Sequence, residues 1–420
     1  MTGLVGGEAP GGRAGAATGA SAPYIAPGAT LGVIGGGQLG RMFVHAAQSM
    51  GYRTAVLDPD PLSPAGLVAH EHIRAAYLDP LALDRLGERC AAITTEFENV
   101  PAAALATLAQ RRPVAPSAAA VSVCQDRLAE KAAFARSGVA CAPHAAISTP
   151  RDVDRAADAL LPGILKTARL GYDGKGQRSV ADRAGLAQAF AALGSAPCVL
   201  EKRLPLAAEI SVVVARNANG EVVHLPVQDN VHVDGILAVT RVPARAHIAD
   251  ATQAEAVALA TTLAEALDYV GVLCVEFFVL ADGSLVANEM APRPHNSGHY
   301  SIDACDLSQF ELQVRAMTGA PLFAPRLHSP CVMLNLLGDL WNGATAPDWR
   351  DVLTLPGAHL HLYGKEEARP GRKMGHLTIT AASAVDAEAR AADAARRLGL
   401  AATAGFAATG LAPPIGLAAI

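Results

Sequence analysis

The sequence has few aromatic residues, few charges and no closely spaced cysteine pairs. Aromatic residues make up 4% of its 420 residues and charged residues 17%. Because it has neither a basic block nor basic residues interleaved with aromatic ones, we expect no nucleic-acid partner. No stretch has the continuous apolar character of a membrane-spanning helix, so we expect no membrane partner. The seven cysteines are scattered without Cys-x-x-Cys spacing, which is typical of reduced thiols in a cytoplasmic protein rather than of disulfides or zinc.

Length and composition indicate a globular chain with more than one domain. Hydrophobic residues make up 51% of the sequence, and the net charge is −5. A chain of this length exceeds one average core, so two or three domains are expected. Residues 1–28 consist largely of Gly, Ala, Pro, Ser and Thr and have no apolar core that follows a basic start. We therefore expect a disordered tail there and no signal peptide.

Two acidic residues, Glu276 and Glu289, flank a predicted β-hairpin. Asp282-Gly283 lies between apolar runs and predicts a two-residue turn with positive φ. The two acids are equally distant from this turn, so they would face each other with Cβ atoms about 5 Å apart. Two carboxylates among apolar neighbours favour a hard divalent cation between them. The alternatives are two acids on an exposed face, or a one-residue bulge that sends them to opposite faces.

A glycine turn spans residues 35–40, after a short apolar strand. Its Gly-x-Gly-x-x-Gly pattern, with Asp58 at the end of the next strand, matches the dinucleotide fingerprint and suggests a nicotinamide enzyme. The turn itself only requires amides that can face a phosphate, and Gln38 and Leu39 would be the donors. A turn with no ligand is also open. The alternation of strands and helices that starts here predicts a parallel α/β sheet.

A second glycine-rich segment, 171–177, lies in the middle of the chain. It does not match a P-loop, so it is either a flap over phosphates or a flexible hairpin tip. Lys166 lies in a short apolar strand five residues earlier, which favours a phosphate partner over an extended, solvated side chain. Arg127 could be another phosphate contact, although a lone arginine on a helix usually faces solvent.

The loop that follows the hairpin is dense in polar groups. Arg293 follows Glu289 closely and is interpreted as an anion clamp beside a metal site. His295 and His299 have the spacing of a helical zinc pair, but Pro294 and Gly298 disfavour a helix there, and no third ligand is evident. A basic cluster near the end of the chain fits either a solvated turn or a phosphate site; it consists of Lys365, Arg369, Arg372 and Lys373.

Taken in order, these motifs resemble the ATP-grasp superfamily, most closely the 5-(carboxyamino)imidazole ribonucleotide synthases of purine biosynthesis. The resemblance covers residues from about 30 to 380. Its marks are Gly-Gln-Leu-Gly-Arg at 37–41, Glu-Phe-Glu-Asn-Val-Pro at 96–101, Gly-Tyr-Asp-Gly-Lys-Gly-Gln at 171–177, Asn-Glu-Met-Ala-Pro-Arg-Pro-His-Asn-Ser-Gly-His at 288–299, and Tyr-Gly-Lys with Arg-Pro-Gly-Arg-Lys at 363–373. The 288–299 segment is the most diagnostic and the glycine turn the least.

The resemblance implies an ATP-grasp architecture of the α/β and α+β classes. An N-terminal parallel α/β domain at 29–124 would bind substrate, and a small lid domain would occupy 125–205. A larger C-terminal domain with a mixed sheet, the metal site and a terminal subdomain would occupy 206–420.

The resemblance also implies a set of site residues for ATP and magnesium. Glu276 and Glu289 would hold Mg²⁺, while the 171–177 segment would close over the phosphates. The implied nucleotide contacts are Arg127, Lys166, Gly171, Tyr172, Asp173, Gly174, Lys175, Gly176, Gln177, Glu201, Lys202, Arg203, Leu204, Glu209, His232, Asn288 and Glu289. Many ATP-grasp proteins carry Glu-x-Asn at the distal metal ligands; here Ala291 stands at the third position, so water or a phosphate oxygen would replace one ligand.

The implied reaction is the ATP- and bicarbonate-dependent carboxylation of aminoimidazole ribonucleotide through carboxyphosphate. The implied catalytic residues are Arg293, His295, Asn296 and Lys365, with His295 assisting proton transfer from the amine. The implied ribonucleotide contacts are Gln38, Leu39, Glu96, Glu98, Lys365 and Arg372, with either Glu96 or Glu98 touching the substrate. The resemblance further implies a cytoplasmic homodimer.

Three other functions compete with this one. A sibling ATP-grasp ligase, such as formate-dependent glycinamide ribonucleotide formyltransferase, would share the nucleotide and metal residues but fits the 293–299 loop poorly. A nicotinamide oxidoreductase would explain Asp58 but leaves the acid pair and Lys166 without a role. A non-catalytic nucleotide-binding module is disfavoured by the intact acid pair.

Overall fold

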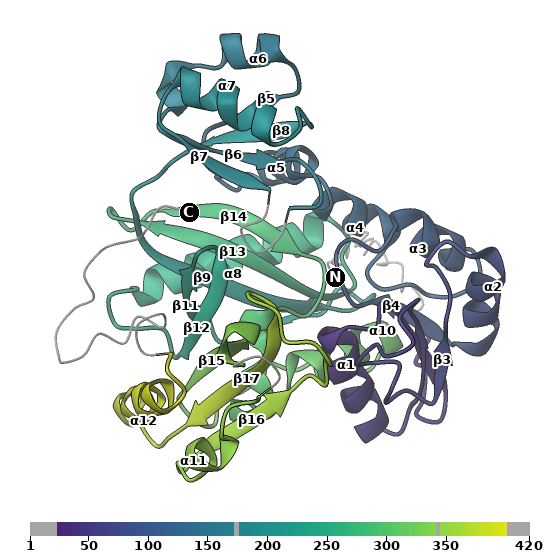
Figure 1. Cartoon of the computed structure of the whole chain (residues 1–420). Helices are drawn as coiled ribbons and strands as arrows, with labels where there is room; N and C mark the ends of the chain where they lie inside the picture. The colour runs from purple at the N-terminus through teal and green to yellow at the C-terminus, as the bar shows by residue number, and fades with distance from the viewer. Residues whose placement is uncertain (1–22, 172–175, 342–344, 401–420) are drawn as a thin grey trace, which may run out of the picture.

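The computed structural model describes residues 23–171, 176–341 and 345–400. The described chain forms three sheets, and the small lid sheet stands apart from the other two at the top of Figure 1. The tail prediction for residues 1–22 and the contacts expected from Tyr172, Asp173, Gly174 and Lys175 lie outside the described residues.

The N-terminal part is a parallel sheet with helices on it, as predicted. Its strand order is β3-β2-β1-β4, and every pairing is parallel. Helix α1 is amphipathic because Leu39, Phe43, Val44 and Ala47 recur on one face and are buried. The elements are β1 Thr30–Ile34, α1 Gln38–Ser49, β2 Arg53–Leu57, β3 Glu71–Ile73, α2 Pro80–Arg89, β4 Ala92–Thr95, α3 Ala102–Ala109 and α4 Ala118–Cys124.

The lid is a four-stranded antiparallel sheet in the order β5-β8-β6-β7. It has a core of its own, in which Leu165, Leu186 and Phe190 are buried. One backbone hydrogen bond, from Ala287 N–H to Ala140 O at 2.8 Å, ties the start of the lid to the large sheet. The elements are α5 Arg127–Arg136, β5 His144–Ile147, α6 Pro150–Arg155, η1 Asp158–Leu160, β6 Gly163–Thr167, β7 Gln177–Val180, α7 Arg183–Ala192 and β8 Cys198–Lys202.

The C-terminal part is a large sheet of nine strands within the described residues. Its main order is β14-β13-β9-β11-β12-β15-β17-β16, and β10 pairs with β9. Every pairing is antiparallel, so the expectation of a mixed sheet is wrong. Four pairs of consecutive strands, β9-β10, β11-β12, β13-β14 and β16-β17, are antiparallel neighbours. The strands are β9 Leu206–Arg216, β10 Val222–His224, β11 Gln228–Val233, β12 Ile236–Val242, β13 Gly271–Leu280, β14 Leu285–Ala291, β15 Cys331–Leu337, β16 Ala358–Leu362 and β17 Lys373–Thr380.

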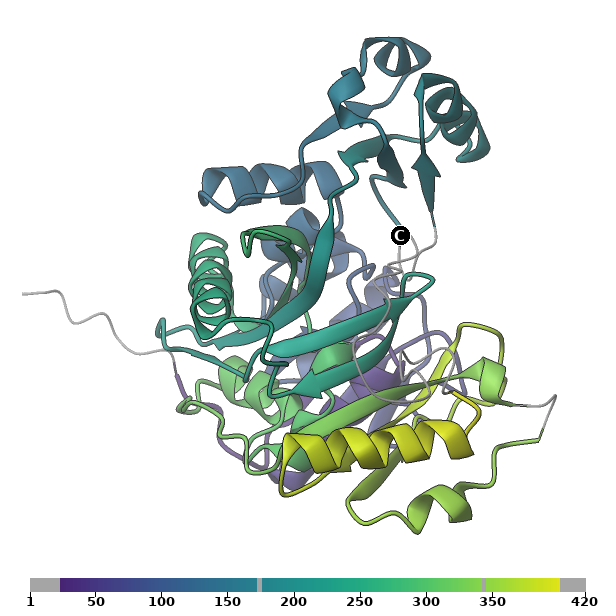
Figure 2. The same ribbon diagram turned by 90° about the vertical axis from the view of Figure 1, so that its left-hand side faces the viewer.

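Helices cover this sheet unevenly. Helix α8 packs on β9 and β13, and α12 packs on β15 and β17 (Figure 2). Along β9 the apolar Ile210, Val212 and Val214 share a core with α8, so the alternate residues, Glu209 and Ser211, face the other way. That other face carries the polar groups described below. The helices are α8 Asp250–Ala266, η2 Asn296–Gly298, α9 Ser301–Ala304, α10 Gln309–Thr318, η3 Gly338–Leu340, α11 Trp349–Leu353 and α12 Ala384–Arg397.

Helix α10 joins the N-terminal sheet to the large sheet. Its Phe310 and Val314 share one buried core with Phe43 of α1. The buried Gln313 accepts from Val272 N–H at 2.6 Å and donates to Thr94 Oγ1 at 3.0 Å, so it bonds both sheets at once. The two sheets therefore form one continuous body, on which the lid stands.

Candidate functional site

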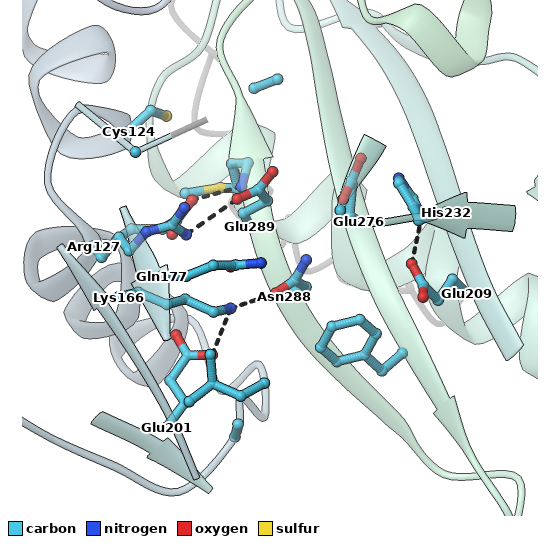
Figure 3. A pocket seen from close by; sticks show the side chains of 18 of the residues that line it. Cys124, Arg127, Lys166, Gln177, Glu201, Glu209, His232, Glu276, Asn288 and Glu289 are labelled. Atoms are coloured by element: carbon cyan, nitrogen blue, oxygen red, sulfur yellow. Dashed lines mark hydrogen bonds and ion pairs between the residues drawn. The ribbon is translucent and has the colours of Figure 1, made fainter. Parts of the chain in front are cut away.

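A cavity of about 450 Å³ lies where the three parts meet. Glu98 comes from the N-terminal part, Lys166 and Glu201 come from the lid, and Glu276 and Glu289 come from the large sheet. Figure 3 shows the lid residues on one side of this space and the hairpin acids on the other. Residues far apart in the sequence thus converge on one site.

The hairpin places Glu276 directly opposite Glu289, as expected, but its turn and its register differ from the predicted ones. The turn is not the predicted two-residue one, because Leu280 N–H donates to Ser284 O at 2.9 Å and leaves three residues in the loop. Only Gly283 in this loop has a positive φ, of 83°. The Asp282 carboxylate accepts hydrogen bonds from Ser284 N–H and Oγ–H, which favours a local loop over the tighter turn.

A β-bulge restores the pairing that the longer turn would have shifted. Phe277 pairs with Ala287 and Glu276 with Glu289, so Asn288 is an extra residue in β14. Successive residues of a regular strand face opposite sides, whereas a bulge allows two neighbours to share a side. Asn288 and Glu289 accordingly both line the cavity.

The acid pair has the electrostatics of a cation site. Burial and the neighbouring Glu289 charge raise the pKa of Glu276 to about 7. Burial also acts to raise the pKa of Glu289, but Arg127 and Lys166 outweigh it and lower that pKa. Arg127 Nη1 lies 3.1 Å from Glu289 Oε2. Two facing carboxylates, one of them destabilised by the other, fit a divalent ion with oxygen ligands.

Two lysines converge on Glu201 in the lid. Lys166 Nζ lies 2.9 Å from Glu201 Oε2 and also donates to Asn288 Oδ1 at 3.4 Å (Figure 3). Lys131 Nζ lies 2.8 Å from Glu201 Oε1. Although burial acts to raise it, these two ammonium groups lower the pKa of Glu201 to about 2. The result is a buried, positively charged wall facing the acid pair.

Sequence reasoning missed Lys131 and its neighbour Glu130. Glu130 lines the cavity and accepts from Met290 N–H at 2.5 Å, and burial raises its pKa to about 8. A signal was present, because Arg127, Glu130 and Lys131 stand at i, i+3 and i+4 on α5 and therefore share one face. This face of α5 contacts β14 beside Glu289.

The other expected nucleotide residues line the same cavity. His232 Nδ1 lies 2.6 Å from a Glu209 carboxylate oxygen. Burial acts to lower the pKa of His232, but Glu209 outweighs it and raises the pKa to about 9. The described lining includes Arg127, Lys166, Gly171, Gln177, Glu201, Lys202, Arg203, Leu204, Glu209, His232, Asn288 and Glu289. Gly176, with a φ of 75°, packs on Thr167 just outside this lining.

The 293–299 loop closes the far end of the cavity, where Arg293, His295 and Asn296 line it. Arg293 Nε lies 2.5 Å from Glu98 Oε2. Burial, Arg293 and Lys373 lower the pKa of His295 well below its usual value, so this imidazole is neutral near pH 7. Asn296 is buried, and neither its amide nitrogen nor its oxygen has a hydrogen-bond partner among the described residues.

The zinc geometry considered for His295 and His299 does not occur. Residues Asn296–Gly298 form a single 3₁₀ turn rather than an α-helix. His299 is buried, and its Nδ1 is bonded to Gln309 Nε2 at 2.9 Å, whereas His295 Nε2 lies 3.3 Å from Glu276 Oε1. The two rings therefore serve different contacts.

The glycine turn is already occupied by protein groups. Leu39 N–H donates to Glu96 Oε1 at 3.3 Å, so a phosphate at this amide would have to replace that carboxylate. The expected phosphate contact stays a prediction. Neither Gln38 nor Leu39 is among the residues that line the cavity, and neither is Glu96, whereas Glu98 is. Sequence could not separate the two acids, because their directions depend on the distant partners Leu39 and Arg293.

The basic segment 363–373 lies against the N-terminal part. A Cβ at Gly364 would stand 3.2 Å from Arg41 Nη1, and the Lys365 charge acts on Glu96. Lys365 Nζ donates to Lys373 O at 2.8 Å, and Arg372 Nη1 donates to Glu367 O at 2.8 Å. Lys373 itself lines the cavity, a contact that the sequence left undecided.

Asp58 explains why the dinucleotide fingerprint misleads. Its carboxylate accepts from Gly36 N–H at 2.7 Å, Tyr77 O–H at 2.7 Å and Asp60 N–H at 2.8 Å. These bonds commit the acid to holding the turn, and a ribose hydroxyl would have to displace them. The nicotinamide hypothesis loses its main support.

A separate group, Asp303, His361 and His376, brings three ligand atoms within 4.8 Å of one another. The two imidazole planes are stacked at 14° with centroids 4.5 Å apart, and His361 Nε2 is bonded to Asp303 Oδ2 at 2.9 Å. Lone pairs that lie in nearly parallel planes cannot converge on one ion. Asp303 and His361 are joined by their hydrogen bond, whereas His376 Nδ1 lies 3.0 Å from the Tyr363 hydroxyl.

Two broader expectations can be compared with the described residues. None of the described helices is long and apolar enough to cross a membrane. All seven cysteines fall within the described residues and are free thiols, five of them buried.

Comparison with known protein families gives three matches along the chain. Residues 28–125 match the ribonucleotide synthetase preATP-grasp domain, residues 132–310 the ATP-grasp domain, and residues 331–390 the phosphoribosylaminoimidazole carboxylase C-terminal domain. The first match covers the N-terminal sheet, the second covers the lid sheet together with strands β9 to β14 of the large sheet, and the third covers the remaining strands β15 to β17. The exact domain boundaries stay a prediction.

Several similar proteins and structures are N5-carboxyaminoimidazole ribonucleotide synthases. An N5-carboxyaminoimidazole ribonucleotide synthase of Brucella melitensis is 48% identical over 357 residues, covering 84% of this chain and 97% of that protein. One of Bacillus subtilis is 43% identical and covers 86% and 93%. The Staphylococcus aureus enzyme structure complexed with ADP has a TM-score of 0.83 at 40% identity, covering 90% and 99%. The Aspergillus clavatus structure with ADP and 5-aminoimidazole ribonucleotide has a TM-score of 0.81 at 32% identity, covering 88% and 98%.

Three features define an ATP-grasp ligase. They are the large antiparallel sheet, the small lid, and the pair of glutamates that faces two lysines. The long matches to relatives of one kind narrow this class further. The chain belongs to the N5-carboxyaminoimidazole ribonucleotide synthase family.

Proposed function

We propose that this chain carboxylates 5-aminoimidazole ribonucleotide with ATP and bicarbonate, giving N5-carboxyaminoimidazole ribonucleotide, ADP and phosphate in purine biosynthesis. The observation that carries the proposal is the cavity itself. One end of the cavity, called the nucleotide end, has the acid pair opposite Lys166. The other end, called the anion end, is lined by Arg293, His295 and Asn296. The family to which the chain belongs has the matching activity in its name.

The nucleotide end holds ATP by charge and by burial. Lys166 and Arg127 neutralise the phosphates, and binding of the triphosphate replaces their present partners Glu201, Asn288 and Glu289. The strand end at 201–204 faces the adenine, and Glu209 with His232 faces the ribose. Phosphoryl transfer needs such alignment and charge neutralisation more than covalent help.

Magnesium fits the residues present. Glu276 and Glu289 would hold it, because they face each other and Glu276 ionises only with difficulty beside Glu289. When bound, the ion supplies positive charge to the phosphates. The absence of a third protein ligand at Ala291 leaves positions for water or phosphate oxygens.

At the anion end, Arg293 orients bicarbonate. A bicarbonate oxygen attacks the γ-phosphorus, the bond to the bridging oxygen breaks, and ADP and carboxyphosphate result. Carboxyphosphate then releases carbon dioxide and phosphate, and the substrate amine bonds to the carbon dioxide carbon and loses a proton. The guanidinium stabilises the anionic intermediate, which is worth roughly 3 kcal/mol for one well-placed donor.

The ribonucleotide binds between the N-terminal part and the 363–373 segment. Lys365 and Arg372 supply cationic groups there, and Lys365 acts on Glu96 electrostatically. Glu98 is our choice for the acid nearest the substrate, because it lines the cavity and meets Arg293. Gln38 stands at the start of α1 on the same side.

ATP hydrolysis measured with each substrate omitted in turn tests this function. We expect ADP formation to depend on both bicarbonate and aminoimidazole ribonucleotide, and the carboxylated ribonucleotide to form in equal amount. Stimulation by formate and glycinamide ribonucleotide instead would establish the sibling ligase. The matched variant is Glu289→Gln, which keeps the size but removes the charge, and it should abolish magnesium-dependent turnover.

A homodimer and a cytoplasmic location complete the proposal. Both come from the family resemblance. Light scattering on the purified chain measures the first, and a mass of one chain, near the 43.0 kDa of the sequence, would contradict it.

A further inference from the structure

We infer that Ser297 and Ser211 are positioning residues, which fix His295 as a hydrogen-bond donor from Nε2 to Glu276 through a buried chain of hydrogen bonds across the large sheet. The inference rests on the proposed function, since it concerns how one carboxylate of the acid pair is held. It assigns roles to two serines that contact neither nucleotide nor substrate.

The tautomer of His295 follows from its neighbours. Ser297 N–H donates to His295 Nδ1 at 3.3 Å, and Ser297 Oγ lies 2.9 Å from the same nitrogen. A backbone N–H can only donate, so Nδ1 is the acceptor and the ring proton is on Nε2. Nε2 lies 3.3 Å from Glu276 Oε1, which therefore receives a donor.

The backbone of His295 is held equally firmly. Gln309 Oε1 accepts from His295 N–H at 2.8 Å, and Gln309 Nε2 donates to His295 O at 2.7 Å. With both peptide groups fixed, the ring direction depends on the groups that meet Nδ1. Ser297 supplies both of those groups.

Behind Ser297, further polar side chains continue the chain in one direction. Thr240 Oγ1 donates to Asn230 Oδ1 at 2.9 Å, and Asn230 Nδ2 donates to Ser211 Oγ at 2.8 Å. The one proton of the Ser211 hydroxyl is shared between Ser297 Oγ at 2.8 Å and Gln228 Oε1 at 3.0 Å. The four side chains that run from Thr240 to Ser297 are 0–4% exposed and lie on β12, β11, β9 and the 3₁₀ turn, all on the cavity face. Buried hydrogen bonds aligned head to tail strengthen one another.

The consequence concerns Glu276. Its Oε1 is oriented by the imidazole, so Oε2 is left to face Glu289 and any ion between them, in the way that outer groups orient ligands in metal sites. A donor tautomer also means that His295 does not take up the amine proton through Nε2. The proton-transfer role expected from the resemblance passes to another group.

The tautomer can be observed directly in the full-length protein by ¹⁵N–¹H correlation spectra of labelled imidazoles. We expect the His295 signal to report a proton on Nε2 and an unprotonated Nδ1. In Ser297→Ala the backbone donor stays but the hydroxyl is lost, so signals of both tautomers should appear. Manganese binding in the presence of ADP, followed by its electron-spin resonance signal, should weaken about tenfold, the lower end of the range for changes in groups that orient metal ligands.

Three further variants keep the inference falsifiable. Ser211→Ala should give a smaller change in the same direction, and Ser297→Thr, which keeps the hydroxyl, should restore most of the manganese affinity. Thr318→Val removes an equally buried hydroxyl that donates to Val314 O within α10, outside this chain of hydrogen bonds, and it should change neither readout. A wild-type proton on Nδ1, or manganese affinity unchanged in Ser297→Ala, would overturn the inference. Failure of the proposed function is seen separately, as wild-type ATP hydrolysis that ignores bicarbonate.

Discussion

At the scale of single residues, the site is built from charges that already have partners. Arg293 meets Glu98, Arg127 meets Glu289, and Lys166 meets Glu201. Each cation thus stands beside a carboxylate that an anionic ligand can replace. Ligand binding exchanges one charged partner for another, so the buried cations are never left without compensation.

Arg293→Ala tests the anion end. We expect turnover to fall roughly a hundredfold, because one stabilising donor is lost, while affinity for magnesium-ADP changes little. Steady-state kinetics and calorimetric ADP binding measure the two effects. Arg326→Ala, which removes an exposed arginine paired with Asp306, is the control. An equal loss of ADP affinity would mean that Arg293 serves the nucleotide.

His232 gives the nucleotide end a dependence on pH. Its pKa rises from 6.5 to about 9 beside Glu209, so the protonated ring favours the folded state. This stabilisation is complete below pH 6.5 and is lost as pH rises through about 9. We expect the melting temperature of the wild type to fall across this window and that of His232→Gln to fall less. His328→Gln, at an exposed position, should behave like the wild type.

At the scale of elements, β14 carries the most information. The sequence predicted that the two glutamates face each other, and they do, although β13 and β14 depart from the predicted hairpin in two places that cancel. The three-residue turn moves the register by one position, and the bulge at Asn288 moves it back. Neither feature has a local signal strong enough to be read from one sequence. The predicted pairing, which assumed a two-residue turn at Asp282-Gly283, is correct only because the two shifts cancel.

Deleting Asn288 tests what the bulge does. The shortened strand would pair without a bulge from Leu285 to Ala291, and Glu289 would still face Glu276. What is lost is the contact between Asn288 and Lys166, so magnesium-ADP should bind about tenfold more weakly, as in Asn288→Ala. Calorimetry on both variants measures this. A deletion variant that binds no nucleotide at all would show that the bulge sets the register itself.

Other elements show which predictions a sequence supports. The strand that holds Lys166 and the strand end at 201–204 were predicted because apolar runs and glycines mark them locally. The pairing of Lys131 with Glu201 joins a helix to a distant strand, and no local pattern specifies it. The direction of Glu96 into the glycine turn is set in the same non-local way.

At the scale of the whole molecule, the chain divides into a fixed body and a lid. The N-terminal sheet and the large sheet share the core around α10, whereas the lid sheet has its own core. At the base of the lid, Phe134 and Val139 are buried in the core of the large sheet, and Ala287 N–H donates to Ala140 O. We therefore expect the lid to be the part that moves when ligands enter. Amide exchange in the lid should be faster than in β9 or β13.

Gln313→Ala tests the unity of the fixed body. The change leaves Val272 N–H and the acceptors Thr94 Oγ1 and Ala115 O without their buried partner. The expected loss is roughly 3 kcal/mol of unfolding free energy, or about 6 °C in melting temperature. Thermal unfolding measures it, with Gln253→Ala on α8 as a control that loses a single bond to Ile248 O. A stability equal to the wild type would mean that the two sheets are joined by apolar contacts alone.

The shared core around α10 has a kinetic meaning as well. The hairpin acids and the 293–299 loop belong to the same rigid body as the N-terminal sheet, so their separation does not change when the lid opens. Lid motion then controls when reactants enter and products leave. The distance between the phosphate site and the site of the substrate amine stays the same throughout the catalytic cycle. Rapid-mixing experiments should therefore find viscosity acting on product release and leaving the transfer step unaffected.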